Sequence, residues 1–284
     1  MQINDNIKAM QQQVQQWKQA GERIAFVPTM GNLHDGHMVL VKAARDRGKR
    51  CVVSIFVNPK QFGPKEDFAT YPRSFETDIE RLKAASVDCV FAPGIEDMYP
   101  EGKDACTSVN VPGLSDVLEG EHRPGFFTGV ATVVNKLFNI VQPDVAIFGE
   151  KDFQQCMVIR RMVRDLAMPI EIISLPTVRE SDGLAMSSRN AYLDHAQRKI
   201  AAELSRCLQQ LADTVRLASG VSFAVIHASQ ALEAQGFEVD YVVVRRQRDL
   251  QTPEDGDTEL VALAAVHLGD TRLIDSIPFV LETA

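Results

Sequence analysis

The feature that most constrains this chain is the stretch Ile24–His37, which reads IAFVPTMGNLHDGH. Its first half is a run of apolar and β-branched residues ending at Pro28, the pattern of a buried strand closed by a turn. Glycines and two histidines follow, and then a run of helix formers with Asp35 as the expected N-cap and Gly48 as the expected C-terminal stop. A strand, a glycine loop and a helix in this order predict a phosphate site, because the amide groups at a helix start favour an anion.

The two histidines of this stretch, His34 and His37, lie three residues apart. Both can therefore face the same side of the helix opening if the helix begins near Asp35. Imidazole donors at that point can hydrogen-bond charge that builds on a phosphoryl oxygen in a transition state. By spacing alone, such a pair is more often half of a metal site or plain surface polarity. The context favours phosphate, since the pair follows a strand and opens a helix where a P-loop would lie, although the P-loop lysine is missing.

The pattern of strands and helices predicts an α/β protein. Runs such as Cys51–Asn58 and Asp144–Phe148 are typical of parallel strands buried on both faces, and the helical segments between strands indicate right-handed βαβ units. After Pro176 come a long polar loop, two helices and further strands, which predict a smaller α/β domain with an antiparallel sheet. We expect a Rossmann-like parallel-sheet domain over residues 1–176 and a C-terminal lid domain over residues 177–284.

Composition and charge exclude several function classes. With 284 residues and 45% hydrophobic content, the chain is long and apolar enough for a proper core. Its net charge of −8 argues against a nucleic-acid surface, which needs clustered Lys and Arg. The first twenty residues lack the features of a signal peptide, and the longest apolar stretch, near Leu260–Leu268, is far short of the roughly 20 residues of a membrane span. The five cysteines show no C-x-x-C spacing, so we expect a cytoplasmic protein without structural zinc.

Several motifs carry a resemblance to a known family. The stretch T-M-G-N-L-H-D-G-H resembles the H-x-G-H motif of adenylyl-transferring nucleotidyltransferases, and with the preceding proline it closely resembles the pantothenate synthetases. The same resemblance continues in NPKQF, LEGEHRPGFFTG, GEKDFQQ and MSSR, so that it covers about Ile24–Leu193. The MSSR stretch resembles the second nucleotidyltransferase motif, usually written K-M-S-K-S. Ala185 stands where the generic form has its first lysine.

This resemblance implies an activity. Members condense (R)-pantoate with β-alanine, using ATP, to give pantothenate, AMP and pyrophosphate through an enzyme-bound pantoyl adenylate, a step that leads toward coenzyme A. The physical sense is that a carboxylate has no leaving group, and adenylation supplies one. The resemblance also implies Mg²⁺ bridging the phosphates of ATP and a homodimer. The small molecules pantoate, β-alanine and ATP are therefore the expected partners.

The nucleotide residues come from the motifs. Lys151 is expected at a helix N-terminus, where its positive charge is unfavourable with the helix dipole. Its presence there suggests a bound anion that attracts both the lysine and the helix N-terminus. Three donors in a row at Ser187–Arg189 suit a triphosphate, with a helix cap as the alternative. The resemblance implies catalytic roles for His34, His37, Lys151, Ser187, Ser188 and Arg189. It implies ATP contacts for Met30, Gly31, His34, His37, Gly149, Glu150, Lys151, Asp152, Val178, Met186, Ser187, Ser188 and Arg189.

The acid-binding residues are expected at the ends of other strands. Asn58 and Gln61 follow a predicted strand, where open α/β sheets place ligands. Without the resemblance, Gln61 would be an ordinary loop residue; with it, Gln61, Gln155 and Asn58 are expected to bind pantoate or β-alanine. Asp78 is the expected metal ligand, although Thr77 stands where some family members have a second carboxylate.

Arg123 has two possible roles that the sequence leaves equal. It either supplies positive charge to the substrate carboxylate or pairs with Glu119 or Glu121.

Two other function classes share part of these features. A simple nucleotidyltransferase moves AMP onto a phosphate acceptor with the same two motifs, but it needs neither glutamine nor a second domain. A nucleotide-sensing protein built on the same sheet would bind ATP and turn nothing over.

Overall fold

The structure, a computed structural model, describes residues 1–64, 66–217 and 220–282. By its internal contacts the chain divides into two units. The first unit is Met1–Gly149 with Val158–Leu175, and the second is Glu150–Met157 with Pro176–Ala284. The segment Glu150–Met157 thus belongs with the C-terminal unit, whereas the sequence predicts a single boundary after residue 176.

The first unit is built on a six-stranded sheet in the order β1-β4-β3-β2-β5-β6, and every pairing is parallel. Its strands are β1 (Gln2–Asn4), β2 (Ile24–Thr29), β3 (Arg50–Ile55), β4 (Cys89–Phe91), β5 (Val145–Gly149) and β6 (Glu171–Leu175). From β2 the chain builds the sheet toward β3 and β4, and it later returns to the other side of β2 with β5 and β6. The switch point therefore lies between β2 and β5, and open α/β sheets bind ligands beyond the carboxyl ends of such strands.

Helices cover both faces of this sheet. The helices of the first unit are α1 (Ile7–Gln19), α2 (Asp35–Arg47), α3 (Phe75–Ala84), α4 (Ile95–Met98), α5 (Glu119–His122) and α6 (Phe126–Val141), with the 3₁₀ turn η1 (Pro59–Gln61), while α7 (Phe153–Asp165) is shared between the two units. Val41 and Leu82 of α2 and α3 pack against Val27 on one face. Side chains alternate along a strand, so Phe26 points to the opposite face, where its ring meets Phe138 of α6 edge-on at 6.4 Å.

The structure confirms the predicted α/β class and corrects some boundaries. Helix α2 begins at Asp35 with His34 as its N-cap, one residue before the expected cap. It ends before Gly48, as predicted, but Gly48 has an extended φ of −120° and is required for packing: a Cβ there would lie 2.6 Å from the Cβ of Ala25. Strand β1 was not predicted, because three residues paired only with β4 carry no periodic signal of their own.

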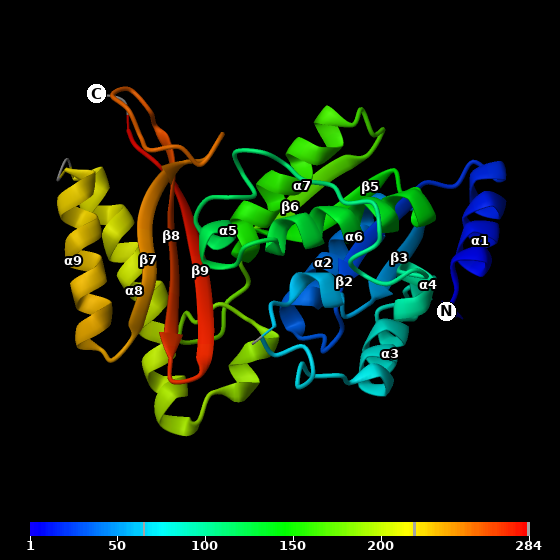
Figure 1. The fold of residues 1–284 in the computed structure, drawn as a ribbon, viewed down its shortest axis with the longest axis horizontal. Helices are drawn as coiled ribbons and strands as arrows, with labels where there is room; N and C mark the ends of the chain where they lie inside the picture. The colour runs from blue at the N-terminus through cyan, green and yellow to red at the C-terminus, as the bar shows by residue number, and fades with distance from the viewer. Residues whose placement is uncertain (65, 218–219, 283–284) are drawn as a thin grey trace. The chain divides into compact units, whose positions relative to one another are not determined.

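The second unit contains an antiparallel sheet in the order β7-β8-β9, as the sequence predicts. Its elements are η2 (Glu150–Asp152), η3 (Ser188–Tyr192), α8 (His195–Arg216), α9 (Val221–Ala234), β7 (Glu238–Arg246), β8 (Glu259–Leu268) and β9 (Thr271–Val280). Helices α8 and α9 run along one face of this sheet (Figure 1). Leu208 of α8, Leu232 of α9 and Val266 of β8 meet in one buried cluster.

In the described part of the chain, no helix combines the length and the apolar character that crossing a membrane requires.

The buried cysteines give a test of this packing. Burial raises the pKa of the Cys51 and Cys89 thiols to about 12 and that of Cys207 to about 11. Only the thiolate is reactive, so a raised pKa leaves these groups protonated and slow at pH 8. With a disulfide reagent at pH 8, we expect one fast thiol, the half-buried Cys106, and four that react only after unfolding, Cys156 being buried as well. A Cys106→Ser variant should lose the fast phase; two or more fast thiols would contradict this packing.

Candidate functional site

The loop between β2 and α2 is fixed at its start by backbone contacts and a glycine. The Thr29 hydroxyl donates to the carbonyl of Ser54 on β3 at 2.7 Å and accepts from the amide of Gly31 at 3.2 Å. Gly31 has a φ of +84°, and a Cβ at this position would lie 3.0 Å from Ile55 and 3.1 Å from the Asp78 carboxylate. Both the left-handed backbone and the close approach require glycine here.

Asp78 holds the middle of the same loop. Its carboxylate is buried on α3 and accepts the amides of Asn32 and Leu33, each at 2.8 Å. The Ser74 hydroxyl adds a third hydrogen bond at 3.2 Å. The metal role expected for Asp78 stays a prediction, since the contacts that the structure shows for this carboxylate are with the loop.

The histidine pair lies at the start of α2. His34 is the N-cap, and its backbone amide donates to Nδ1 of His37 at 3.2 Å, so His37 takes the place that Glu or Gln has in a capping box. The two ring centroids are 4.0 Å apart. Because Nδ1 of His37 accepts, a neutral imidazole carries its proton on Nε2. The sequence prediction that both histidines share one helix opening is confirmed by this geometry.

Asn58 and Gln61 form a unit at the end of β3. Asn58 is 1% exposed, and its amide nitrogen donates to the Gln61 side-chain oxygen at 2.9 Å and to the carbonyl of Gly129 at 3.2 Å. Its oxygen accepts from the Tyr99 hydroxyl at 2.7 Å. The bond from Asn58 engages the side-chain oxygen of Gln61, so Nε2 is the donor that this amide offers.

Helix α6 packs closely on this turn. A Cβ on Gly129 would lie 2.2 Å from the carbonyl oxygen of Lys60, so the helix approaches the backbone of η1 where only glycine fits.

Arg123 turns out to have a partner that sequence reasoning missed. Its guanidinium makes a bidentate pair with Glu66 at 2.8 and 2.7 Å and donates to the backbone carbonyl of Gln61 at 3.1 Å. The Glu119 carboxylate lies 3.7 Å from the guanidinium, so the pairing with Glu119 that the sequence offered as one role of Arg123 is present but long. The guanidinium also lies over the Phe126 ring, 3.7 Å from its centroid. No local signal could have indicated Glu66, because it lies 57 residues away in the chain.

Of the GEKD residues, Gly149 ends β5 in the first unit, and Glu150–Asp152 form the turn η2 in the second unit. Lys151 and Asp152 are a loose pair, with Nζ 3.9 Å from the carboxylate, and Lys151 is 19% exposed. The backbone carbonyl of Glu150 accepts a hydrogen bond from the Ser276 hydroxyl at 2.6 Å. Gln155 follows in the first turn of α7.

The MSSR residues extend from a short antiparallel loop in the same unit. The amide of Met186 donates to the carbonyl of Val178 at 2.9 Å, so these two residues of the predicted ATP set face each other. Ser187 is the N-cap of η3, and its hydroxyl accepts the amide of Arg189 at 3.3 Å. Ser187 therefore caps a helix, as the alternative interpretation of the serines predicts. This cap is compatible with a ligand role for the same residue.

The structure thus groups the predicted residues in two sets. Each set lies within one unit. The first unit holds Met30, Gly31, His34, His37, Asn58, Gln61, Asp78 and Gly149. The second unit holds Glu150, Lys151, Asp152, Gln155, Val178, Met186, Ser187, Ser188 and Arg189.

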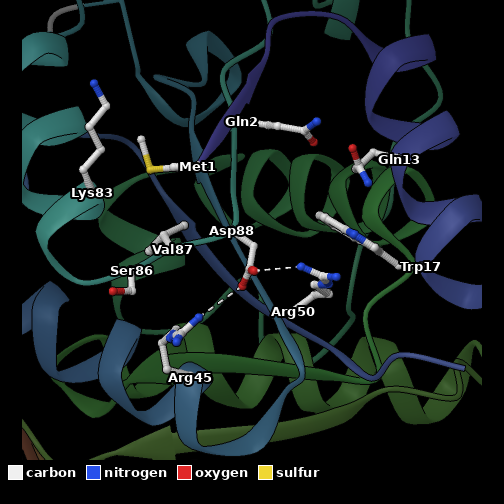
Figure 2. Close-up of a pocket in the computed structure, with 10 residues that line it drawn as sticks. All are labelled: Met1, Gln2, Gln13, Trp17, Arg45, Arg50, Lys83, Ser86, Val87 and Asp88. Atoms are coloured by element: carbon white, nitrogen blue, oxygen red, sulfur yellow. Dashed lines mark hydrogen bonds and ion pairs between the residues drawn. The ribbon is translucent and has the colours of Figure 1, made fainter. Parts of the chain in front are cut away.

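A pocket of about 790 Å³ lies in the first unit, away from these residues. It is lined at the amino-terminal ends of the strands by Gln2, Arg50 and Asp88, opposite the carboxyl ends that carry the histidine loop (Figure 2). Asp88 bridges Arg45 and Arg50 at 3.3 and 3.1 Å. The Arg50 guanidinium also holds the pKa of Glu22 below its usual range. The two arginines of this pocket are therefore paired with carboxylates of the protein itself, and none of the predicted site residues lines it.

Comparisons with known proteins assign the chain to a family. The family model for pantoate–β-alanine ligase matches residues 2–278. The pantothenate synthetase of Shewanella loihica is 53% identical over 98% of this chain and 99% of its own length. The pantothenate synthetase structure from Thermus thermophilus superimposes with a TM-score of 0.91 at 44% identity, covering 98% of this chain and 99% of that one.

A third relative was solved with ligands. The pantoate–β-alanine ligase of Francisella tularensis, complexed with β-γ ATP and β-alanine, has a TM-score of 0.82 at 35% identity and covers 98% of this chain and 97% of its own. On the family match and the identity over nearly the full length, this chain belongs to the pantoate–β-alanine ligase family.

Proposed function

We propose that this protein joins pantoate to β-alanine at the expense of ATP, releasing AMP and pyrophosphate. The observation that carries the proposal is the strand–loop–helix of β2 and α2, with His34 and His37 at the helix start beside the switch point of the sheet, in a chain of the pantoate–β-alanine ligase family. The ATP and β-alanine held by the Francisella relative are the nucleotide and the amine of this reaction.

The reaction proceeds in two steps. A pantoate carboxylate oxygen attacks the α-phosphorus of ATP, the bond to the β-phosphate breaks, and pyrophosphate leaves with its electron pair. The neutral amine of β-alanine then attacks the acyl carbon of the pantoyl adenylate, the bond from this carbon to the AMP oxygen breaks, and AMP departs while the nitrogen gives up one proton to water as the amide forms. Nucleotidyl transfer needs positioning and charge neutralisation more than covalent help from the protein, so residues that donate hydrogen bonds suffice for the first step.

The α2 start supplies donors for the α-phosphate. The first amide groups of a helix have no partner inside it, and they point toward an anion together with the positive end of the helix dipole. His37 adds an Nε2–H, because its Nδ1 is occupied as an acceptor of the His34 amide. A donor preorganised in this way stabilises charge that grows on the phosphoryl oxygens in the transition state.

Gln61 is the residue that we assign to pantoate in the first unit. Its side-chain oxygen is engaged by Asn58, which orients Nε2 as the donor. Asn58 itself is buried with bonds to Gln61, Gly129 and Tyr99, so it acts on the substrate through Gln61. Gln155 on α7 is the second glutamine assigned to pantoate.

The residues of the second unit are assigned to the remaining phosphates and the nucleoside. Lys151, Ser188 and Arg189 supply charge and hydroxyl donors to the departing pyrophosphate. Asp152 is assigned to the ribose, and Val178 and Met186 to the nucleotide through their adjoining backbone. Mg²⁺ would enter with the ATP substrate and neutralise part of the charge of its phosphates. We propose a homodimer in the cytoplasm as the working form, as the family resemblance implies.

Isotope exchange tests the proposed function. With labelled pyrophosphate, ATP and Mg²⁺ and no β-alanine, we expect label to enter ATP only when pantoate is present, because only then does a reversible acyl adenylate form. Addition of β-alanine should divert the adenylate to pantothenate. Exchange without any acid, or none with pantoate, would contradict the ligase mechanism.

Substitution of His37 separates its two bonds. His37→Ala should lower the rate of adenylation by about 10²–10³, the scale for losing one preorganised donor. In His37→Asn the side-chain oxygen can still accept the His34 amide, but the shorter side chain places no donor at the position of Nε2, so thermal stability should return toward that of the parent without recovery of rate. Pre-steady-state formation of pyrophosphate measures the step. The matched control is His227→Ala, an exposed imidazole on α9; full activity in His37→Ala would refute the role.

Substitution of Gln61 tests the acid site. Gln61→Ala removes a hydrogen bond to a charged group and should raise the KM for pantoate by about 10- to 100-fold, with the KM for ATP little changed. Lys60→Ala is the control, since Lys60 lies in the same turn and its Nζ bonds to the Lys103 carbonyl. An unchanged pantoate requirement in Gln61→Ala would reject this assignment.

A further inference from the structure

A buried ion pair joins the loop after Pro176 to strand β9. Arg179 makes a bidentate pair with Asp275, at 2.7 and 3.0 Å, and also donates to the Ser205 hydroxyl at 3.0 Å and the Gly183 carbonyl at 3.1 Å. Asp275 is only 3% exposed. A carboxylate this deeply buried is retained only with a full set of partners, so the position of Arg179 is tightly defined.

The next residue of β9 holds the other segment. Ser276 is 1% exposed, and its hydroxyl donates to the backbone carbonyl of Glu150 at 2.6 Å. Its own carbonyl accepts from Arg179 at 3.4 Å, and its amide donates to Asp275 at 2.7 Å. Strand β9 is an edge of the three-stranded sheet, and these contacts occupy that edge.

Both segments lead directly into residues that we assign to phosphate. Glu150 immediately precedes Lys151, and the loop that contains Arg179 returns through Ala185, with which Arg179 forms a β-bridge, to the MSSR residues. Elements η2 and η3 each contact β9. Two consecutive residues of one strand thus connect the lysine segment with the serine–arginine segment inside the second unit.

We propose that Asp275, Ser276 and Arg179 are positioning residues, which hold Lys151 and the Ser187–Arg189 segment in the mutual geometry that a triphosphate requires. The proposal rests on the function proposed above and adds residues to it that touch no substrate. Because the two phosphate-binding segments are fixed to one strand, they act as a single preformed anion site. Loosening the strand contacts should therefore weaken binding of the polyphosphate and leave the acid-binding residues of the first unit unaffected.

Ser276→Ala is the decisive variant, because it removes one hydroxyl and leaves the buried ion pair in place. We expect its KM for ATP to rise about fivefold, the scale of one lost hydrogen bond, and to rise more than the KM for pantoate, because Gln61 lies in the first unit and only Gln155 follows the Glu150 segment. Binding of a non-hydrolysable ATP analogue, measured by calorimetry without pantoate, should weaken by the same factor. Hydrogen exchange of the amides in 150–153 should become faster.

Asp275→Asn tests the ion pair itself. It keeps the shape of the side chain but removes the charge, and we expect a larger rise in the KM for ATP, about 10- to 100-fold, because the partly buried Arg179 guanidinium loses its buried counter-charge. If this variant folds poorly, the KM values for ATP of Ser276→Ala and Arg179→Lys test the positioning role in its place.

Asp240→Asn is the matched control. Asp240 lies on β7 in the same sheet and pairs with Arg272 of β9 at 2.7 Å, so its loss disturbs the same strand at a comparable ion pair. The proposal requires that this control leave the KM for ATP unchanged.

The outcomes separate the two proposals. A parent protein without pantoate-dependent exchange would refute the proposed function, whatever the variants do. An active parent in which Ser276→Ala leaves the affinity for ATP unchanged would overturn the positioning role. So would variants in which the KM values for ATP and pantoate rise by the same factor, since that pattern indicates a general loss of structure.

Discussion

The geometry of the histidine loop depends on one buried carboxylate. Asp78 accepts two consecutive backbone amides, those of Asn32 and Leu33, and thereby closes the loop between β2 and the first residue of α2. Two amide donors in a loop would otherwise need water, and a carboxylate away from solvent would otherwise carry a large desolvation cost, so each satisfies the other. The left-handed Gly31 brings the backbone near this carboxylate. The α2 start, and with it the direction in which His37 points, follows from this contact.

Under the assignments that we propose, each unit supplies a separate part of the chemistry. The first unit carries the helix start and the amide of Gln61, while the second carries Lys151 and the serine–arginine segment fixed to β9. In nucleotidyl transfer the α-phosphorus is attacked while charge moves onto the departing pyrophosphate, and these two needs correspond to the two sets of donors. Each set is rigid by itself, because buried contacts such as Asp275 with Arg179 hold it, and preorganised donors lose little entropy when the ligand arrives.

Local patterns predicted the fold well and the supporting contacts poorly. The β-branched runs were sufficient to predict strands of the parallel sheet, since a buried parallel strand reads as a continuous apolar run. Gly48 was sufficient to predict where α2 ends. Strand β1 could not be found this way, because its pairing partner β4 lies far along the chain. The motifs located the candidate site, yet the partners of its residues did not follow from them. Asp275 and Glu66 lie 96 and 57 residues from the arginines that they bind, and no periodicity connects such pairs.

The contacts of Arg123 bear on how the acid is recognised. Its guanidinium is committed to Glu66 and to the Gln61 carbonyl, and it is 12% exposed, so its charge is neutralised inside the protein. Under our assignment, pantoate is then held in the first unit by the neutral amide of Gln61. This choice suits a carboxylate that must act as a nucleophile. A guanidinium bound directly to it would stabilise the ground-state charge and lower its reactivity, whereas interactions raise the rate only when they are stronger in the transition state. Arg123 instead fixes the backbone of Gln61, and in our proposal the Gln61 amide orients the carboxylate without neutralising its charge.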